Sequence, residues 1–123
     1  MDRAQLARMV VAVDAVGCLA TSIAVRALPS VFRAVDPSLR SRPAVASALV
    51  GTAGVLALGL TGAAPTRRQL SVAALANAAW AVGCVVVLPG QRTATGRALV
   101  AGTGMLDAGL GSLQWALRPA RQR

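Results

Sequence analysis

Apolar residues fall into four long runs, separated by short polar segments rich in arginine, glycine and proline. The runs cover residues 9–25, 44–64, 70–88 and 98–117. A helix needs about 20 apolar residues to cross the hydrocarbon core of a bilayer, and these runs are close to that length. The pattern predicts an all-α fold in which residues 1–123 form a single transmembrane domain, an integral membrane four-helix bundle with short loops.

Composition agrees with a membrane protein and changes the interpretation of the charges. Of the 123 residues, 55% are hydrophobic and 14% are charged, and the mean hydropathy is +0.60. Thirteen arginines against four acids give a formal charge of +9, which in a soluble protein would suggest nucleic-acid binding. Because the arginines flank the apolar runs, we instead expect them to face lipid head groups. The predicted partners are membrane lipids and no nucleic acid.

Four spans place both chain termini on the same side of the membrane. Seven arginines lie at the termini and in the second loop, and six lie in the first and third loops. Segments richer in arginine prefer the cytoplasm. The predicted location is therefore the cell membrane, with cytoplasmic termini.

The segment at 26–43 is a longer connector between the first two runs. It contains four arginines and three prolines. Its apolar side chains recur at helical spacing: Leu28, Val31, Phe32 and Val35. This spacing favours a short helix that lies in the membrane interface and ends at Pro37, and the alternative is a solvated loop.

Matches between the two halves of the chain suggest an internal repeat. Residues 48–50 and 98–100 both read Ala-Leu-Val, and residues 15–18 and 81–84 both read Ala-Val-Gly-Cys. The chain is either two duplicated helical hairpins, related by an axis along the membrane normal, or a set of similar helices that match by chance. Two acids within the runs, Asp14 and Asp107, interrupt the matching pattern.

Small residues offer surfaces for close helix packing. Lipid tails are as apolar as leucine, so membrane helices associate through close backbone contact and polar contacts. Pairs of small residues four apart occur in three runs: Ser47 and Gly51, Ala79 and Gly83, Ala98 and Gly102. We expect these faces to pack within the bundle, or one of them to form a homodimer.

The fourth run carries an acid, Asp107, near its middle. An ionisable side chain at that depth costs about 2.5–3.5 kcal/mol or more, so we expect it to be buried against protein and to be a functional residue. Helical periodicity puts Thr103 and Gln114 on the same face. Trp115, near the end of this run, is expected to anchor the helix at the interface.

Asp14 is the second acid within a run, and Asn77 and Trp80 share a face of the third predicted helix. In an antiparallel bundle, Asp14, Asn77 and Asp107 would lie about 8, 11 and 15 Å from a membrane edge. We therefore expect these three side chains to meet around one internal cavity. No arginine lies within the runs, so the acids have no cation partner there.

The amino-acid composition excludes several kinds of metal site and catalytic mechanism. The chain has no histidine and two cysteines. It therefore lacks the usual ligand sets for zinc, haem and iron–sulfur clusters, and it lacks a Ser-His-Asp nucleophile. Cys18 and Cys84 lie inside apolar runs, where a free thiol behaves as a small hydrophobe. We expect no metal and no cofactor.

Two functions fit this polar set. In the leading interpretation the chain is an accessory or lipophilic-ligand-binding membrane protein that holds a lipophilic small molecule or a membrane partner protein. The alternative is a cofactor-free membrane enzyme, of isomerase or cyclase type. Its catalytic acid and base would be Asp14 and Asp107, because one of two acids that meet holds a proton at neutral pH. The same groups would also serve as interhelical hydrogen bonds or, in an oligomer, as a proton path. The predicted ligand-binding side chains are Asn77, Trp80, Thr103 and Gln114.

Short motifs resemble a broad, largely uncharacterised group of small bacterial four-helix integral membrane proteins. Asp14 is followed by Gly17 in the first run, residues 77–80 read Asn-Ala-Ala-Trp in the third, and Gln114 lies late in the fourth. The group has an acid or amide three residues before a tryptophan in its third helix, and here Asn77 stands where aspartate is commoner. The resemblance implies this topology and the bacterial inner membrane, and it implies no function.

Overall fold

The computed structural model of the chain describes residues 1–120. Its elements, in chain order, are α1 (Arg3–Ala27), α2 (Pro29–Phe32), α3 (Arg42–Leu58), α4 (Arg67–Val87), the 3-10 helix η1 (Leu88–Gly90) and α5 (Ala94–Ala116). None of the described residues is in a strand. The prediction of an all-α fold is confirmed.

Side-chain caps explain why three helices begin before the apolar runs. Asp2 and Gln5 form a capping box at the start of α1, and Thr66 and Gln69 form one at the start of α4. The side chain of Thr93 caps α5. Because a capped first turn accommodates polar side chains, the hydrophobic pattern alone places these helix starts too late.

The third helix ends earlier than predicted. The apolar run continues to residue 64, but α3 ends at Leu58, and residues 59–64 form a turn followed by bends. Glycines in this stretch favour turns over helix. The side-chain amide of Gln69 donates a hydrogen bond to the Leu58 carbonyl (3.0 Å), so this terminal carbonyl is satisfied by the next helix.

Two helical segments, Arg3–Ala27 and Arg67–Gly90, are long and apolar enough to cross a membrane. The helix α3 is apolar but has 17 residues. The helix α5 has 23 residues, but Asp107 and Gln114 reduce its hydropathy. Length and composition alone therefore support two of the four predicted spans.

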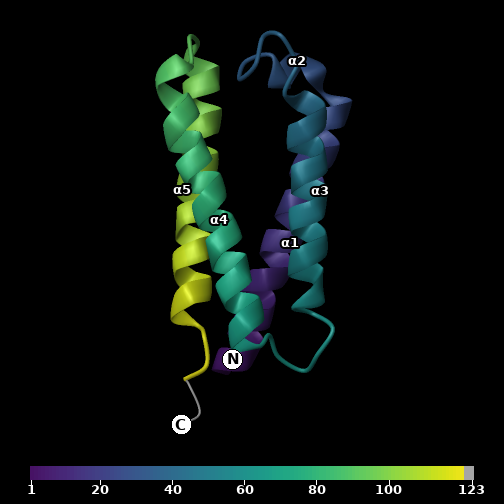
Figure 1. Cartoon of the computed structure of the whole chain (residues 1–123), viewed down its shortest axis with the longest axis vertical. Helices are drawn as coiled ribbons and strands as arrows, with labels where there is room; N and C mark the ends of the chain where they lie inside the picture. Colours follow the sequence, from purple (N-terminus) through teal and green to yellow (C-terminus); the bar gives the residue numbers. More distant parts are fainter. Residues whose placement is uncertain (121–123) are drawn as a thin grey trace.

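The four long helices form two pairs, α1 with α3 and α4 with α5. Within each pair the helices lie side by side, whereas the two pairs converge at the end that holds both chain termini and diverge toward the other end (Figure 1). Arg3 donates a hydrogen bond to the Ala116 carbonyl (2.5 Å), which holds the start of α1 beside the end of α5. This pairing is compatible with two hairpins, while their origin by duplication stays a prediction.

The connector between α1 and α3 is a one-turn helix followed by a hydrogen-bonded turn. Phe32 of α2 is buried. The Asp36 carboxylate accepts hydrogen bonds from the amide and hydroxyl of Ser38 (3.0 and 2.6 Å) and of Ser41 (2.9 and 2.6 Å). These bonds, led by that from the Ser38 hydroxyl, hold the pKa of Asp36 well below its usual range. The predicted helix is thus present but shorter than the apolar spacing suggested.

Two glycines allow α4 and α5 to approach closely. A Cβ atom at Gly104 would lie 2.9 Å from the Cβ of Cys84. A Cβ atom at Gly111 would lie 3.1 Å from the Cβ of Asn77 and 3.2 Å from the Ala74 carbonyl oxygen. A side chain at either position would therefore force its neighbours on α4 to shift.

The small-residue pairs predicted from the sequence do not make these contacts. A Cβ atom at Gly51, Gly83 or Gly102 would meet nothing within 4 Å. The prediction that they pack within the bundle is wrong, because Gly104 faces α4 and Gly102 is turned away from it. Gly54 precedes Gly104 by 50 residues, the same offset that relates residues 48–50 to 98–100. It also has open space around it, so the two helix pairs pack differently.

We expect Gly111→Val to lower the free energy of unfolding by about 1–3 kcal/mol, because the added methyl groups overpack the α4–α5 contact. Gly109→Val on the same helix is the matched control, since a Cβ atom there meets nothing within 4 Å. The control should change the stability by less than about 0.5 kcal/mol. Unfolding of the detergent-solubilised protein by heat or dodecyl sulfate measures both changes. Equal losses would show that α4 and α5 do not pack through Gly111.

Candidate functional site

Three polar side chains from three helices meet in the interior. They are Asp14 of α1, Asn77 of α4 and Gln114 of α5, each no more than 3% exposed. The Asn77 amide donates to Asp14 Oδ2 (2.6 Å) and to Gln114 Oε1 (2.9 Å). The Gln114 amide also donates to Asp14 Oδ2 (2.6 Å). We call this closed ring of hydrogen bonds the polar node.

The polar node connects the two helix pairs, because Asp14 belongs to one pair and its two amide partners belong to the other. A second polar contact joins the pairs where the Trp80 indole N–H donates to the Thr52 hydroxyl (3.3 Å). Hydrogen bonds contribute about 0.5–1.5 kcal/mol each in soluble proteins, and interhelical bonds in membranes average about 0.6 kcal/mol. The node therefore contributes orientation as well as stability.

Asp107 does not join the node. It lies seven residues before Gln114 on α5, which corresponds to about 10 Å along the helix axis. The two residues share a helical face, as predicted, but Asp14 lies at the height of Gln114. The expectation that Asp14, Asn77 and Asp107 meet around one cavity is therefore correct for the first two residues only, and Gln114 takes the third place.

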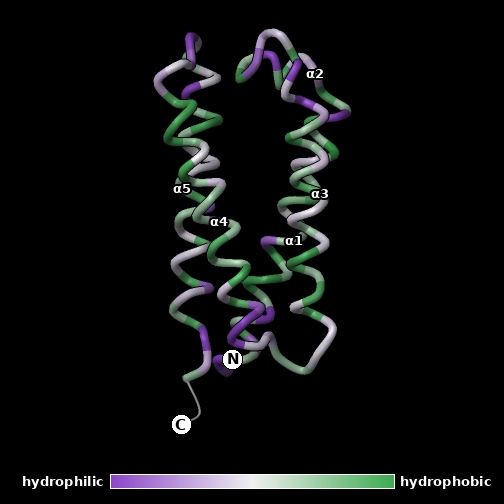
Figure 2. Tube along the Cα trace, viewed as in Figure 1, coloured by the Kyte–Doolittle hydropathy of each residue, from purple (hydrophilic) through white to green (hydrophobic). Residues whose placement is uncertain are grey.

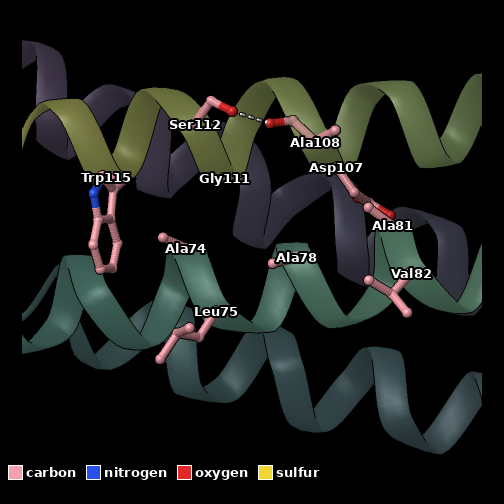
Figure 3. Close-up of a pocket in the computed structure, with 10 residues that line it drawn as sticks. All are labelled: Ala74, Leu75, Ala78, Ala81, Val82, Asp107, Ala108, Gly111, Ser112 and Trp115. Carbon is pink, nitrogen blue, oxygen red and sulfur yellow. Dashed lines mark hydrogen bonds between the residues drawn. The ribbon is translucent and has the colours of Figure 1, made fainter.

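An open groove of about 620 Å³ lies between α4 and α5, and Asp107 lines it. Trp115 extends from α5 toward α4 at one end of the groove, and the Asp107 side chain points toward α4 at the other end (Figure 3). Small side chains form much of the wall between them. The other lining residues are Ala74, Leu75, Ala78, Ala81, Val82, Ala108, Gly111 and Ser112.

The Asp107 carboxyl group has no hydrogen-bond partner among residues 1–120, and it is only partly buried. The Ser112 hydroxyl is engaged, since it donates to the Ala108 carbonyl (2.7 Å). At the other end of the groove, the Arg118 guanidinium stacks on the Trp115 ring, 3.0 Å from its centroid. The groove thus offers a carboxyl group with unused hydrogen-bonding capacity in mostly apolar surroundings.

The predicted ligand-binding residues separate into different environments. Asn77 and Gln114 belong to the node, where their hydrogen bonds are used. Trp80 packs against the apolar core. Thr103 is exposed on α5 and does not line the groove. Periodicity shows which residues share a face of one helix, but it does not give the relative heights and rotations of different helices.

The groove was not predicted from the sequence, and Trp115 was predicted only as an anchor at the membrane interface. A signal was present in the spacing of Ala74, Ala78 and Ala81, which puts three small side chains on one face of the third predicted helix, α4 in the structure. Opposite Gly111, such a face leaves a depression. The sequence did not reveal that Trp115 and Asp107 would bound it.

Metal-binding groups are absent from the part of the chain that the structure describes: no three His, Cys, Asp or Glu side chains there could hold a metal ion. Cys18 is buried and Cys84 is half-buried, and both are free thiols. The Cys18 thiol lies near Asp14 Oδ1 (3.8 Å) as a weak donor at the edge of the node. This placement fits a packing role for Cys18.

Comparisons with known proteins found no matching family model, no matching curated protein and no matching solved structure. The fold and the site define a class only: an all-helical chain in which a polar node lies inside and an apolar groove with one carboxyl group lies outside. The resemblance drawn from short motifs stays a prediction.

Asp14→Ala tests whether the node joins the helix pairs. It removes the acceptor of two buried donors, and each unsatisfied donor costs about 1–3 kcal/mol, so the free energy of unfolding should fall by about 2–5 kcal/mol. Asp107→Ala is the matched control: it removes the same carboxyl group where no described partner is lost. Its stability should be unchanged or higher in the same unfolding assay.

A double-mutant cycle between Asn77→Ala and Gln114→Ala should give a coupling energy above about 0.5 kcal/mol, because both amides share one acceptor. Equal destabilisation by Asp14→Ala and Asp107→Ala, or additive effects of the two amide substitutions, would contradict the node.

Proposed function

We propose that the chain is a multi-pass membrane protein whose four long helices cross the bilayer. The observation that carries this proposal is reversed polarity: large apolar side chains cover the outer faces of the helices, while the node is buried. The exposed apolar side chains include Met9, Val13, Val16 and Ile23 of α1, Leu75, Val82, Val85 and Val86 of α4, and Met105, Leu106 and Leu113 of α5. Such a surface is a liability in water and is matched to lipid.

The distribution of charge agrees with this proposal. Hydrophobic positions follow the lengths of the helices and hydrophilic positions gather at their ends (Figure 2). The arginines among residues 1–120 lie in the loops or near the ends of the helices, where guanidinium groups reach lipid head groups.

The two less apolar or shorter helices are compatible with spanning. At 17 residues, α3 is about 26 Å long, which is near the lower limit for crossing the hydrocarbon. In α5, Gln114 faces the node and Asp107 faces the groove beside α4. The exposed large side chains along the rest of α5 are mainly apolar, among them Leu99, Met105, Leu106 and Leu113. Packing against α4 therefore lets this helix tolerate its polar groups.

A topology experiment tests the membrane proposal. Reporter domains that are active on one side of the membrane only, fused in turn to the N-terminus, to the connector near Ser38 and to the C-terminus, should give one result for both termini and the opposite result for the connector. The protein should also remain with membranes after carbonate extraction. Recovery in the soluble fraction, or opposite results for the two termini, would contradict four spans.

Within the membrane, we infer that the chain holds a lipophilic small molecule in the outer groove. A volume of about 620 Å³ lies within the range of about 300–1,000 Å³ that is common for small-molecule sites. The walls are mainly apolar, and Asp107 supplies a polar group able to orient a ligand. The groove opens on the surface that would face lipid, so a molecule dissolved in the bilayer reaches it directly.

The depth of Asp107 narrows the chemistry of the ligand. It lies 13 residues after Ala94 and nine before Ala116 in α5, so it is about 20 and 14 Å from the ends of that helix. This is close to the middle of the bilayer. We therefore propose a mainly apolar molecule that carries a hydroxyl or amine group within its apolar body.

The enzyme alternative receives less support. A catalytic pair of Asp14 and Asp107 requires both acids to reach one substrate. Asp14 is 3% exposed and accepts hydrogen bonds from Asn77 and Gln114. Its replacement by alanine would therefore act on stability first.

Reaction with a hydrophobic carbodiimide tests access to the groove, because such reagents enter the bilayer and modify protonated carboxyl groups there. We expect dicyclohexylcarbodiimide to modify Asp107 in preference to Asp14, as measured by mass spectrometry of peptides. Ala78→Phe, which fills the groove, should lower the modification of Asp107. Val16→Phe on the outer face of α1 is the control and should leave it unchanged. Preferential modification of Asp14 would contradict this assignment of the two acids.

Apolar molecules that co-purify with the protein provide the second readout. Solvent extracts of the wild type should contain a compound that is depleted in extracts of Ala78→Phe and Asp107→Leu and retained with Val16→Phe. Identical extracts from all four proteins would count against ligand binding in the groove, even if the carbodiimide reached Asp107.

A further inference from the structure

The two ends of the molecule use their arginines differently. At the end that holds the termini, arginine side chains donate hydrogen bonds to backbone carbonyls: Arg3 to Ala116, Arg8 to Gly62 and Arg67 to Pro119. Carbonyls near helix ends lack partners within the helix, so these guanidinium groups stabilise loops and helix termini. Their capacity to bind other groups is reduced.

At the opposite end, which we call the connector end (residues 26–42 and 90–97), the guanidinium groups are largely unused. Arg97 donates to the Gln91 carbonyl (3.3 Å). The remaining five have no hydrogen-bond or ion-pair partner among residues 1–120: Arg26, Arg33, Arg40, Arg42 and Arg92.

The acid at this end offsets only one of the six positive charges. Asp36 is the single acid in these two segments, and its carboxylate oxygens accept hydrogen bonds from Ser38 and Ser41. These bonds keep Asp36 charged but direct it into its own turn. Six arginines against one acid leave the connector end strongly positive.

A hollow lies in the connector end. It has a volume of about 310 Å³ and is lined by residues 34–38 and 90–93, so the lining holds one arginine, Arg92, and one acid, Asp36. The Thr93 hydroxyl donates to the Ala34 carbonyl (3.4 Å), and Gly96 lies so close to that carbonyl that a Cβ atom there would be 2.2 Å from its oxygen. The connector is thus held against the turn between α4 and α5, and the hollow is formed by two segments distant in sequence.

We propose that this hollow binds the head group of an anionic phospholipid. Arg92 in the lining would bind its phosphate. Arg33 and Arg40, which flank the lining segment 34–38 in the sequence, would add positive charge. The acyl chains would lie along the apolar outer faces of the helices. The arginine guanidinium matches phosphate oxygens in geometry and charge. A lipid is favoured over soluble phosphate because the hollow lies where apolar helix surface meets the charged end. The inference rests on the proposed membrane location.

The test uses the full-length protein in nanodiscs of phosphatidylcholine with or without phosphatidylglycerol. Bound lipid is identified by native mass spectrometry after release into detergent. We expect the wild type to retain phosphatidylglycerol selectively. Each substitution Arg33→Gln, Arg40→Gln or Arg92→Gln should weaken retention by about fivefold, since one arginine near an anionic surface contributes about that factor.

Arg68→Gln is the matched control, because Arg68 lies at the other end and its side chain also has no partner among the described residues. It should retain phosphatidylglycerol as the wild type does. Circular dichroism should show equal helicity in all variants, since no described contact is lost. An equal effect of Arg68→Gln, or no effect of the three connector-end substitutions, overturns the proposal.

Competition distinguishes the sources of phosphate. Free phosphatidylglycerol should displace the bound lipid, whereas millimolar inorganic phosphate or RNA should not. If phosphate or RNA displaced the lipid equally well, the basic end would bind a soluble ligand and the lipid proposal would be overturned. Failure of the membrane proposal itself would give a different result, because the protein would then not incorporate into nanodiscs of either composition.

Discussion

The hydrogen-bonded carboxyl group of Asp14, buried between two pairs of helices, is the interaction on which the rest of this structure depends. Within each pair, apolar packing and, for α4 and α5, close glycine contacts hold the helices together. Between the pairs such packing is sparse toward the connector end. Asp14 connects them through two amides from different helices. Because hydrogen bonds depend on direction as well as distance, this contact fixes the rotation and the height of α1 relative to α4 and α5.

The node and the groove are built on the same helix contact. Gly111 approaches the Cβ of Asn77 in the node, and Gly111 also lines the groove beside Asp107. A change that separates α4 from α5 at this point would therefore alter both. The two acids are chemically alike but differ in their surroundings. Asp14 accepts hydrogen bonds from buried donors, whereas the hydrogen-bonding capacity of Asp107 is unused.

Much of the fold follows from the sequence, because segment length and apolar content depend on local residues. The four helices, their order and the connector could be predicted in this way. Helix starts could not, since the Asp2 and Thr66 caps lie outside the apolar runs. Periodicity placed Asp107 and Gln114 correctly on one face. Whether Asp107 or Gln114 contacts Asp14 depends on the relative heights of α1 and α5, and these heights result from packing.

The unpaired state of Asp107 argues for function more strongly than the burial of Asp14 does. Asp14 accepts hydrogen bonds from two buried amide groups, so its contribution to stability is a sufficient reason for an acid at this position. An acid without a described partner in a membrane-facing groove contributes no such term and disfavours insertion by about 2.5–3.5 kcal/mol on biological scales. Alanine at this position would fit the groove as Ala78 and Ala81 do. A carboxyl group that opposes folding in its own surroundings, at the end of a groove sized for a small molecule, is better explained by what it binds than by what it holds together.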